Sequence, residues 1–360
     1  MASFGDIRSI AQRAPGTGTW WDLCDAFESY EGAEPVEDRV LPYCEAQLSR
    51  WPPEIARAMP VAWLEALAVG RRVPGARLAN AITNWNSVTS AKLTGLSRAA
   101  GVQNVRLLEL SVGVSGVMMH HQPRPLAPGH VEQDEAFVGA LERLFAGPMR
   151  GLEVLVLGDR TVDPRLAGHV AALPRLRSLT LEGCRHDEAA LDHLAAGPFA
   201  SLTDLHVQRW APSSIDALLE SSWFGRLEAL SLRGCSLDGP WVERVFDDPS
   251  VSNLRALDLG VNLLGVDALC ALLTSPALVR LEHLTMDRLE QDDPSWAPLE
   301  QRVARMAALE AALERATLGR LVELGLRETL LHDGEIAVIR RWASARGVEL
   351  RYTRYVDQLT

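Results

Sequence analysis

The sequence predicts an α/β solenoid, in which short parallel strands form a curved sheet on a concave side and helices cover a convex side. Three observations predict this fold. A leucine pattern recurs at a nearly constant period, strand-like and helix-like periodicities alternate within each period, and neither face of one such unit can be buried without a neighbour. Repeats of 20 to 50 residues are the general signature of stacked arrays.

The recurring pattern is Leu-x-x-Leu-x-Leu, with two conservative replacements. Clear copies begin at positions 152, 176, 202, 227, 254, 281 and 321, and the first six follow one another at intervals of 24 to 27 residues. Weaker copies begin at Val105 and Ala345, and a still more degenerate one lies around Leu78 to Asn84. The agreement of period and phase over seven copies indicates an array of equivalent structural units.

Each period contains two kinds of apolar spacing. The Leu-x-Leu core alternates with period two, as a short strand requires. The residues that follow change to helical spacing, as in the series Val162, Leu166, Val170 and Leu173. Narrow strands then gather on one side and wider helices spread on the other, which predicts curvature.

These repeats resemble the leucine-rich repeat family. The family pattern continues with Asn or Cys three residues after the last leucine, and Cys184, Cys235 and Asn262 match that position. Four other copies depart from it, with Arg160, Trp210, Leu289 and Thr329. The resemblance covers about residues 100 to 353 and is closest to the ribonuclease-inhibitor-like and bacterial subclasses. It implies that Cys184 and Cys235 fill inward-facing turns.

The sequence predicts two regions, a helical N-terminal capping region at residues 1–100 and the leucine-rich repeat solenoid at residues 101–360. The first region reads as short amphipathic helices separated by prolines, and a separate recognition module is the alternative to a cap. Within the solenoid, prolines and glycine predict a projecting loop from Met118 to Asp134. A long helix is expected from Pro298 to Thr317, with one apolar stripe packed on the convex core, and a protruding helix is the alternative.

Composition excludes several classes of function. The 360 residues carry a net charge of -11, and Lys92 is the only lysine, so the clustered cations that bind nucleic acid are missing. Neither a signal peptide nor an apolar run of membrane-spanning length is present, so no membrane association is expected. The five cysteines are irregularly spaced, which fits a reducing cytoplasm. Arg-rich, Lys-poor composition is associated with bacterial proteins.

No catalytic or metal-binding constellation is expected. Cys184 precedes His186 and Asp187, but its repeat position favours a buried structural thiol over a nucleophile. His120, His121 and His130 share the predicted loop, yet nothing at ligand spacing completes a zinc site. Motifs for dinucleotides, phosphate loops and hydrolase nucleophiles are missing. We therefore expect no enzymatic activity, no cofactor and no metal.

The concave face remains as the candidate site. Side chains between and just after the strand leucines point away from the core, and in the middle repeats they form a dense surface of mixed charge. The predicted partner-binding residues are His206, Gln208, Arg209, Arg233, Asp258, Asp287 and Arg288. The sequence thus predicts a noncatalytic interaction module or scaffold that binds a protein partner. The alternative is a regulator such as a small-GTPase activator, with Arg160, Arg209 or Arg288 reaching the nucleotide, or a bacterial effector.

Overall fold

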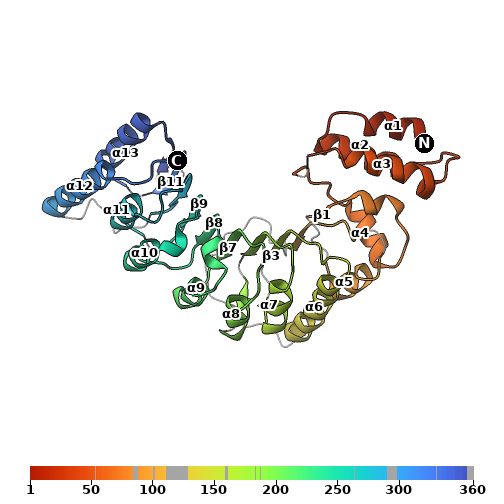
Figure 1. Ribbon diagram of the computed structural model, residues 1–360, viewed down its shortest axis with the longest axis horizontal. Helices are drawn as coiled ribbons and strands as arrows, with labels where there is room; N and C mark the ends of the chain where they lie inside the picture. The colour runs from red at the N-terminus through yellow and green to blue at the C-terminus, as the bar shows by residue number, and fades with distance from the viewer. Residues whose placement is uncertain are drawn as a thin grey trace. The chain divides into compact units, whose positions relative to one another are not determined.

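A computed structural model describes the chain in residues 1–52, 54–83, 88–99, 102–110, 129–158, 161–182, 184–186, 188–262, 264–289, 298–329 and 331–354. These residues form two compact units, unit 1 (Met1–Leu176) and unit 2 (Arg177–Thr360). Each unit combines parallel strands with helices, as Figure 1 shows.

Unit 1 begins with helices and ends with the first repeats. Its α-helices are α1 (Phe4–Ala11), α2 (Thr17–Glu28), α3 (Leu41–Leu48), α4 (Val61–Ala68), α5 (Ser90–Leu96), α6 (Gly129–Ala146) and α7 (Pro164–Ala171). Its strands are β1 (Ala81–Ile82), β2 (Leu107–Leu110), β3 (Val154–Gly158) and β4 (Thr161–Val162). Strands β1, β2 and β3 pair in parallel and in that order. The weak repeat copy near Leu78 therefore supplies a strand, although a very short one.

Unit 2 repeats a strand and a helix along its whole length. Its strands are β5 (Ser178–Glu182), β6 (Arg185–His186), β7 (Asp204–Gln208), β8 (Ala229–Arg233), β9 (Ala256–Asp258), β10 (His283–Thr285), β11 (Glu323–Thr329) and β12 (Glu349–Arg354). Its α-helices are α8 (Glu188–Ala195), α9 (Pro212–Leu219), α10 (Gly239–Phe246), α11 (Val266–Thr274), α12 (Leu299–Glu314) and α13 (Asp333–Arg346). Figure 1 shows the strands on one side of this unit and the helices on the other.

The sheet of unit 2 is parallel and in register from repeat to repeat. Its strand order is β5-β7-β8-β9-β10-β11-β12, which follows the chain except that β6 stands apart. Equivalent leucines lie opposite one another, so Leu205 pairs with Leu230, and Leu230 with Leu257. All three side chains are buried. The predicted phase is correct, because the leucines face the core.

Two backbone ladders join consecutive repeats. At the strand entry, the N–H groups of Glu228, Arg255 and Glu282 each donate to the equivalent carbonyl of the repeat before, with N···O distances of 2.7 Å. At the strand exit, the ladder runs the other way, as from the N–H of Gly234 to the carbonyl of Gly260 at 2.9 Å. Buried backbone groups are therefore satisfied at both ends of the strands. The chain folds as a leucine-rich repeat solenoid, as the sequence predicts.

The structure differs from the loop predicted within the solenoid. The loop expected from Met118 to Asp134 is wrong for its last part, because α6 begins at Gly129. The last helix-breaking proline of this segment is Pro128, so nothing beyond it opposes a helix. The rest of that predicted loop, residues 118–128, lies outside the described residues.

The long helix expected from Pro298 to Thr317 is present as α12, but its apolar stripe is only half packed. Leu309 and Leu313 are buried, whereas Leu299 and Val303 are 67% and 61% exposed. Helix α12 has 16 residues and its neighbour α11 has 9, so α11 is too short to cover the whole stripe. Arg305 of α12 is anchored to the buried Glu335 of α13 by an ion pair of 2.5 Å.

The division into a cap at residues 1–100 and repeats at residues 101–360 stays a prediction. Helices α1 to α5 lie within the first region, as expected, but β1 does too. Cys24 and Cys44 are buried within α2 and α3. Among the described helices, none combines the length and hydrophobicity needed to cross a bilayer.

The repeat phase can be tested at Leu230, which is 1% exposed in the middle of β8. Leu230→Asp buries an unpaired carboxylate at a cost of several kcal/mol, so cooperative thermal unfolding should be lost. The matched control is Val279→Asp, because Val279 is 47% exposed and an acid there remains hydrated. Circular dichroism melting curves compare the two variants with wild type. A Leu230→Asp protein that melts like wild type would contradict the phase.

Candidate functional site

The predicted partner-binding residues all belong to unit 2, where the structure places them on or directly after consecutive strands. His206 and Gln208 lie on β7, Arg233 on β8 and Asp258 on β9, while the other three follow the ends of β7 and β10. In-register pairing sets His206 beside Ser231, and Ser231 beside Asp258. Because side chains alternate along a strand, these positions lie opposite the buried leucines. We call the surface formed by the predicted partner-binding residues and their neighbours at the same repeat positions the strand face.

Arg233 is the centre of a charged cluster on the strand face. Its guanidinium lies 3.8 Å from Asp258 Oδ1 and 3.7 Å from Asp287 Oδ2. Asp258 is itself held, because its Oδ1 accepts the Gly260 N–H at 2.8 Å. A side chain at Gly260 would begin 2.5 Å from a guanidinium nitrogen of Arg233, so glycine leaves the space that this guanidinium occupies. The cluster joins three consecutive repeats.

A second ion pair lies at the next strand exits. Asp287 is only 13% exposed and accepts the Arg327 N–H at 2.9 Å, in addition to its contact with Arg233. Arg288 pairs with Glu328 through its Nε. Glu328 was not among the predicted site residues, although it has the same place in its repeat as Arg288. That equivalence is the signal in the sequence that points to the pair.

His206, Gln208 and Arg209 differ from this cluster. Their side chains have neither an ion pair nor a hydrogen bond with any residue that the structure describes. Arg209 is exposed, and the other two are half-buried. The strand face thus contains ion-paired side chains at β8 to β10 and, at β7, polar side chains without a partner among the described residues, which we call the uncommitted groups.

In unit 2, a residue near the exit of five strands has a left-handed backbone. Arg209, Gly234, Val261, Arg288 and Glu328 have φ angles of 63°, 65°, 61°, 57° and 53°. All five occupy the same position, seven residues after the first leucine of their repeat. The shared turn explains why Arg209 and Arg288 lie in equivalent places, at the exits of β7 and β10, which are separated by β8 and β9 in the sheet.

The position after this turn points inward, as the family resemblance implied. Asn262 is buried, and its Nδ2 donates to the carbonyls of Leu232 and Leu259, both at 2.8 Å. Its Oδ1 accepts the Leu237 N–H at 3.2 Å. Cys235 takes the same place, and its Sγ lies 3.8 Å from the Val207 carbonyl. Trp210 is buried at this position too.

Nothing in the described part of the chain assembles a nucleophile or a metal centre. Cys184 is buried, as predicted, while Asp187 lies outside the described residues. The same is true of His120 and His121, and His130 belongs to α6, where its side chain is not described. No group of three metal-ligating side chains occurs among the described residues.

Comparison with known proteins adds a fold-level likeness. No family model and no curated protein matches the chain. Among solved structures, an internalin from Listeria monocytogenes is 15% identical, with a TM-score of 0.34, over 78% of this chain and 71% of the internalin. The tropomodulin C-terminal domain of Caenorhabditis elegans is 16% identical, with a TM-score of 0.27, over 38% of this chain and 74% of that domain. The repeat register of the chain itself carries the fold assignment.

The burial of the two repeat cysteines can be tested with a thiol reagent. Burial raises the pKa of Cys235 to about 11, so at neutral pH this thiol is both covered and protonated. Cys184 is buried as well. Both should react only after denaturation, when all five cysteines of the chain become available. Mass spectrometry after brief labelling identifies the modified positions, and rapid labelling of both in the native protein would contradict the inward assignment.

The same thiol predicts a pH dependence of stability. The folded pKa of Cys235, about 11, lies above the value of about 8.5 for an exposed thiol. Its contribution to stability is therefore fully present below the unfolded pKa and is lost as the pH rises toward the folded value. Cys235→Ala should show a smaller fall in Tm than wild type between those two pH values. An identical fall in both proteins would show that this thiol does not carry the effect.

Proposed function

We propose that the chain is a noncatalytic interaction module or scaffold, which binds a protein partner through the strand face of unit 2. The observation that carries the proposal is the arrangement of Arg233 between Asp258 and Asp287, beside the uncommitted groups of β7. Side chains that are already held lose less conformational freedom on binding. Arginine is also enriched among the residues that dominate interface energies.

The chemistry expected of the partner depends on which arginines of the strand face already pair with a carboxylate. Arg233 and Arg288 each have a carboxylate partner within the strand face. Arg209 is exposed and has none within the described residues, so it is the cation with the most to gain from an acidic group on the partner. His206 and Gln208 lie on β7, directly before Arg209, and supply further hydrogen-bonding groups. We infer a polar partner surface with a carboxylate opposite Arg209.

Replacing Arg209, Arg233 and Arg288 together would be a poor test of this proposal. Asp287 is 13% exposed and contacts Arg233, so Arg233→Ala leaves a largely buried carboxylate with fewer partners and lowers stability. Arg209→Ala avoids this difficulty. Arg209 makes no ion pair in the described structure. Arginine and alanine both carry a Cβ, so the substitution adds no steric strain at this left-handed residue. The matched control is Arg340→Ala on the outer face of α13, where Arg340 is exposed.

The test uses the full-length chain to capture partners from the native lysate, followed by affinity measurements on each captured protein. Arg209→Ala should weaken binding by about tenfold or more, as expected for loss of an interface anchor. Its Tm should stay within the small range typical of surface substitutions. Arg340→Ala should bind like wild type. If Arg209→Ala retains the same partners at unchanged affinity, the strand face is not the binding site.

A further inference from the structure

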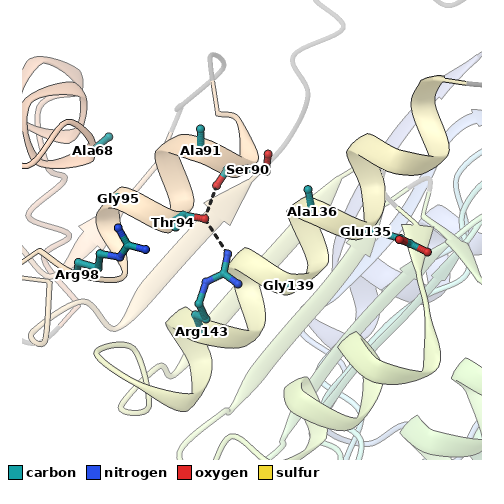
Figure 2. Close-up of a pocket in the computed structure, with 10 residues that line it drawn as sticks. All are labelled: Ala68, Ser90, Ala91, Thr94, Gly95, Arg98, Glu135, Ala136, Gly139 and Arg143. Atoms are coloured by element: carbon teal, nitrogen blue, oxygen red, sulfur yellow. Dashed lines mark hydrogen bonds between the residues drawn. The ribbon is translucent and has the colours of Figure 1, made fainter.

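A hollow in unit 1 has the composition of an anion site. It lies between α5 and α6, next to the end of α4, and its volume is about 500 Å³. Figure 2 shows the residues that line it. They are Ala68, Ser90, Ala91, Thr94, Gly95, Arg98, Glu135, Ala136, Gly139 and Arg143. No part of the strand face contributes to it.

Two polar stripes face each other across this hollow. Ser90, Thr94 and Arg98 are spaced four residues apart along and just beyond α5, so they share one side of that segment. Glu135, Gly139 and Arg143 have the same spacing on α6. Small residues keep the space between the stripes open. A side chain at Gly95 would collide with the Ala68 carbonyl at 1.8 Å, which shows how closely α5 approaches α4.

Arg143 is held in position by a short chain of hydrogen bonds. Its NH2 group donates to Thr94 Oγ1 at 2.8 Å, and Thr94 Oγ1 donates to the Ser90 carbonyl at 2.8 Å. The threonine hydroxyl therefore donates its hydrogen bond to the backbone carbonyl and accepts one from the guanidinium. Figure 2 shows this chain as dashed lines. The remaining N–H groups of Arg143 stay available to a ligand.

Two of the residues that line the hollow are arginines. Neither Arg98 nor Arg143 has an ion pair with any carboxylate in the described ranges of the chain. Glu135 is the one acidic residue among the lining residues, and Figure 2 shows its carboxylate turned away from both guanidinium groups. The two cations repel each other, and an anion placed between them removes that repulsion.

We propose that this hollow binds the phosphoryl group of a phosphate monoester, with Arg98 and Arg143 as the binding cations. A phosphate monoester carries about −1.5 to −2 charges at neutral pH, which matches two guanidinium groups, whereas a carboxylate carries one. Guanidinium groups bind phosphate oxygens with paired hydrogen bonds. The Ser90 hydroxyl lies in the same lining and supplies a further donor. The phosphoryl group comes from a small phosphorylated metabolite or from a phosphorylated side chain.

The test is isothermal titration calorimetry on the full chain, with inorganic phosphate, phenyl phosphate and a phosphoserine peptide as separate probes. Binding should be saturable at constant ionic strength, and chloride at equal ionic strength should not reproduce it. Arg98→Gln and Arg143→Gln should each weaken phosphate binding by about tenfold or more, because each removes charged hydrogen bonds. Thr94→Val should weaken it too, since it removes the bond that positions Arg143.

Controls separate this site from a general effect of charge or folding. Arg50→Gln changes an exposed arginine elsewhere in unit 1 and should bind phosphate like wild type. Arg98 makes no ion pair within the described structure, so Arg98→Gln should keep the wild-type Tm. Tighter binding of the phosphoserine peptide than of phenyl phosphate would assign the phosphoryl group to a protein, and the reverse order to a small molecule. Phosphate binding that is absent, or unchanged in both arginine variants, would overturn the proposal.

Discussion

The geometry of unit 2 depends on how the chain leaves each strand. The backbone has to turn from the sheet toward the helix while its N–H still pairs with the next repeat. A left-handed residue seven places after the first leucine of the repeat meets both demands, as Val261 shows. Its φ is 61°, and its N–H donates to the Asp287 carbonyl at 2.7 Å. A β-branched residue in this conformation is strained by about 1–2 kcal/mol. The strain persists because the buried Asn262 beside it satisfies carbonyls of two repeats.

This turn also decides what the strand face can present. Because this left-handed residue recurs at the same place in each repeat, its side chain lies beside its counterparts in the neighbouring repeats. Arg288 and Glu328 occupy this position in consecutive repeats and form an ion pair. Two strands earlier, at the end of β8, Arg233 contacts acidic residues from the two repeats that follow its own. The charges of the strand face are therefore part of the stacking of the repeats, and their stability contribution is reduced by their partial exposure.

The sequence predicts most of this fold because the leucine spacing reports burial directly. Leu205, Leu230 and Leu257 could be assigned to the core from their period alone, and the inward Cys235 and Asn262 followed from the family resemblance. The packing of α12 could not be predicted in this way. Helical periodicity identifies an apolar stripe, but it does not predict the length of the neighbouring helix that packs on it. Leu299 is exposed because that neighbour is too short to reach it.

The contacts of Arg233 within the strand face could not be predicted from the sequence either. The spacing of Arg233, Asp258 and Asp287 shows that they share a surface, but not that a glycine at position 260 opens the space that the guanidinium occupies. The hollow between α5 and α6 was missed for a different reason. Its two arginines, Arg98 and Arg143, are far apart in the chain, and only the packing of the helices brings their residues into one lining.

Countered and uncountered charges lead to different roles in binding. A paired arginine such as Arg233 already has its hydrogen-bonding groups partly occupied, so a partner that engages it gains less attraction and has to remove water from three charges at once. An exposed arginine that has no carboxylate partner within the described residues, such as Arg209, gives up only water to bind a partner's acid. Mixed-sign pairs therefore favour shape and specificity, while the free cation contributes more of the attraction. By this argument, recognition on the strand face is centred on β7, at the margin of the charged cluster.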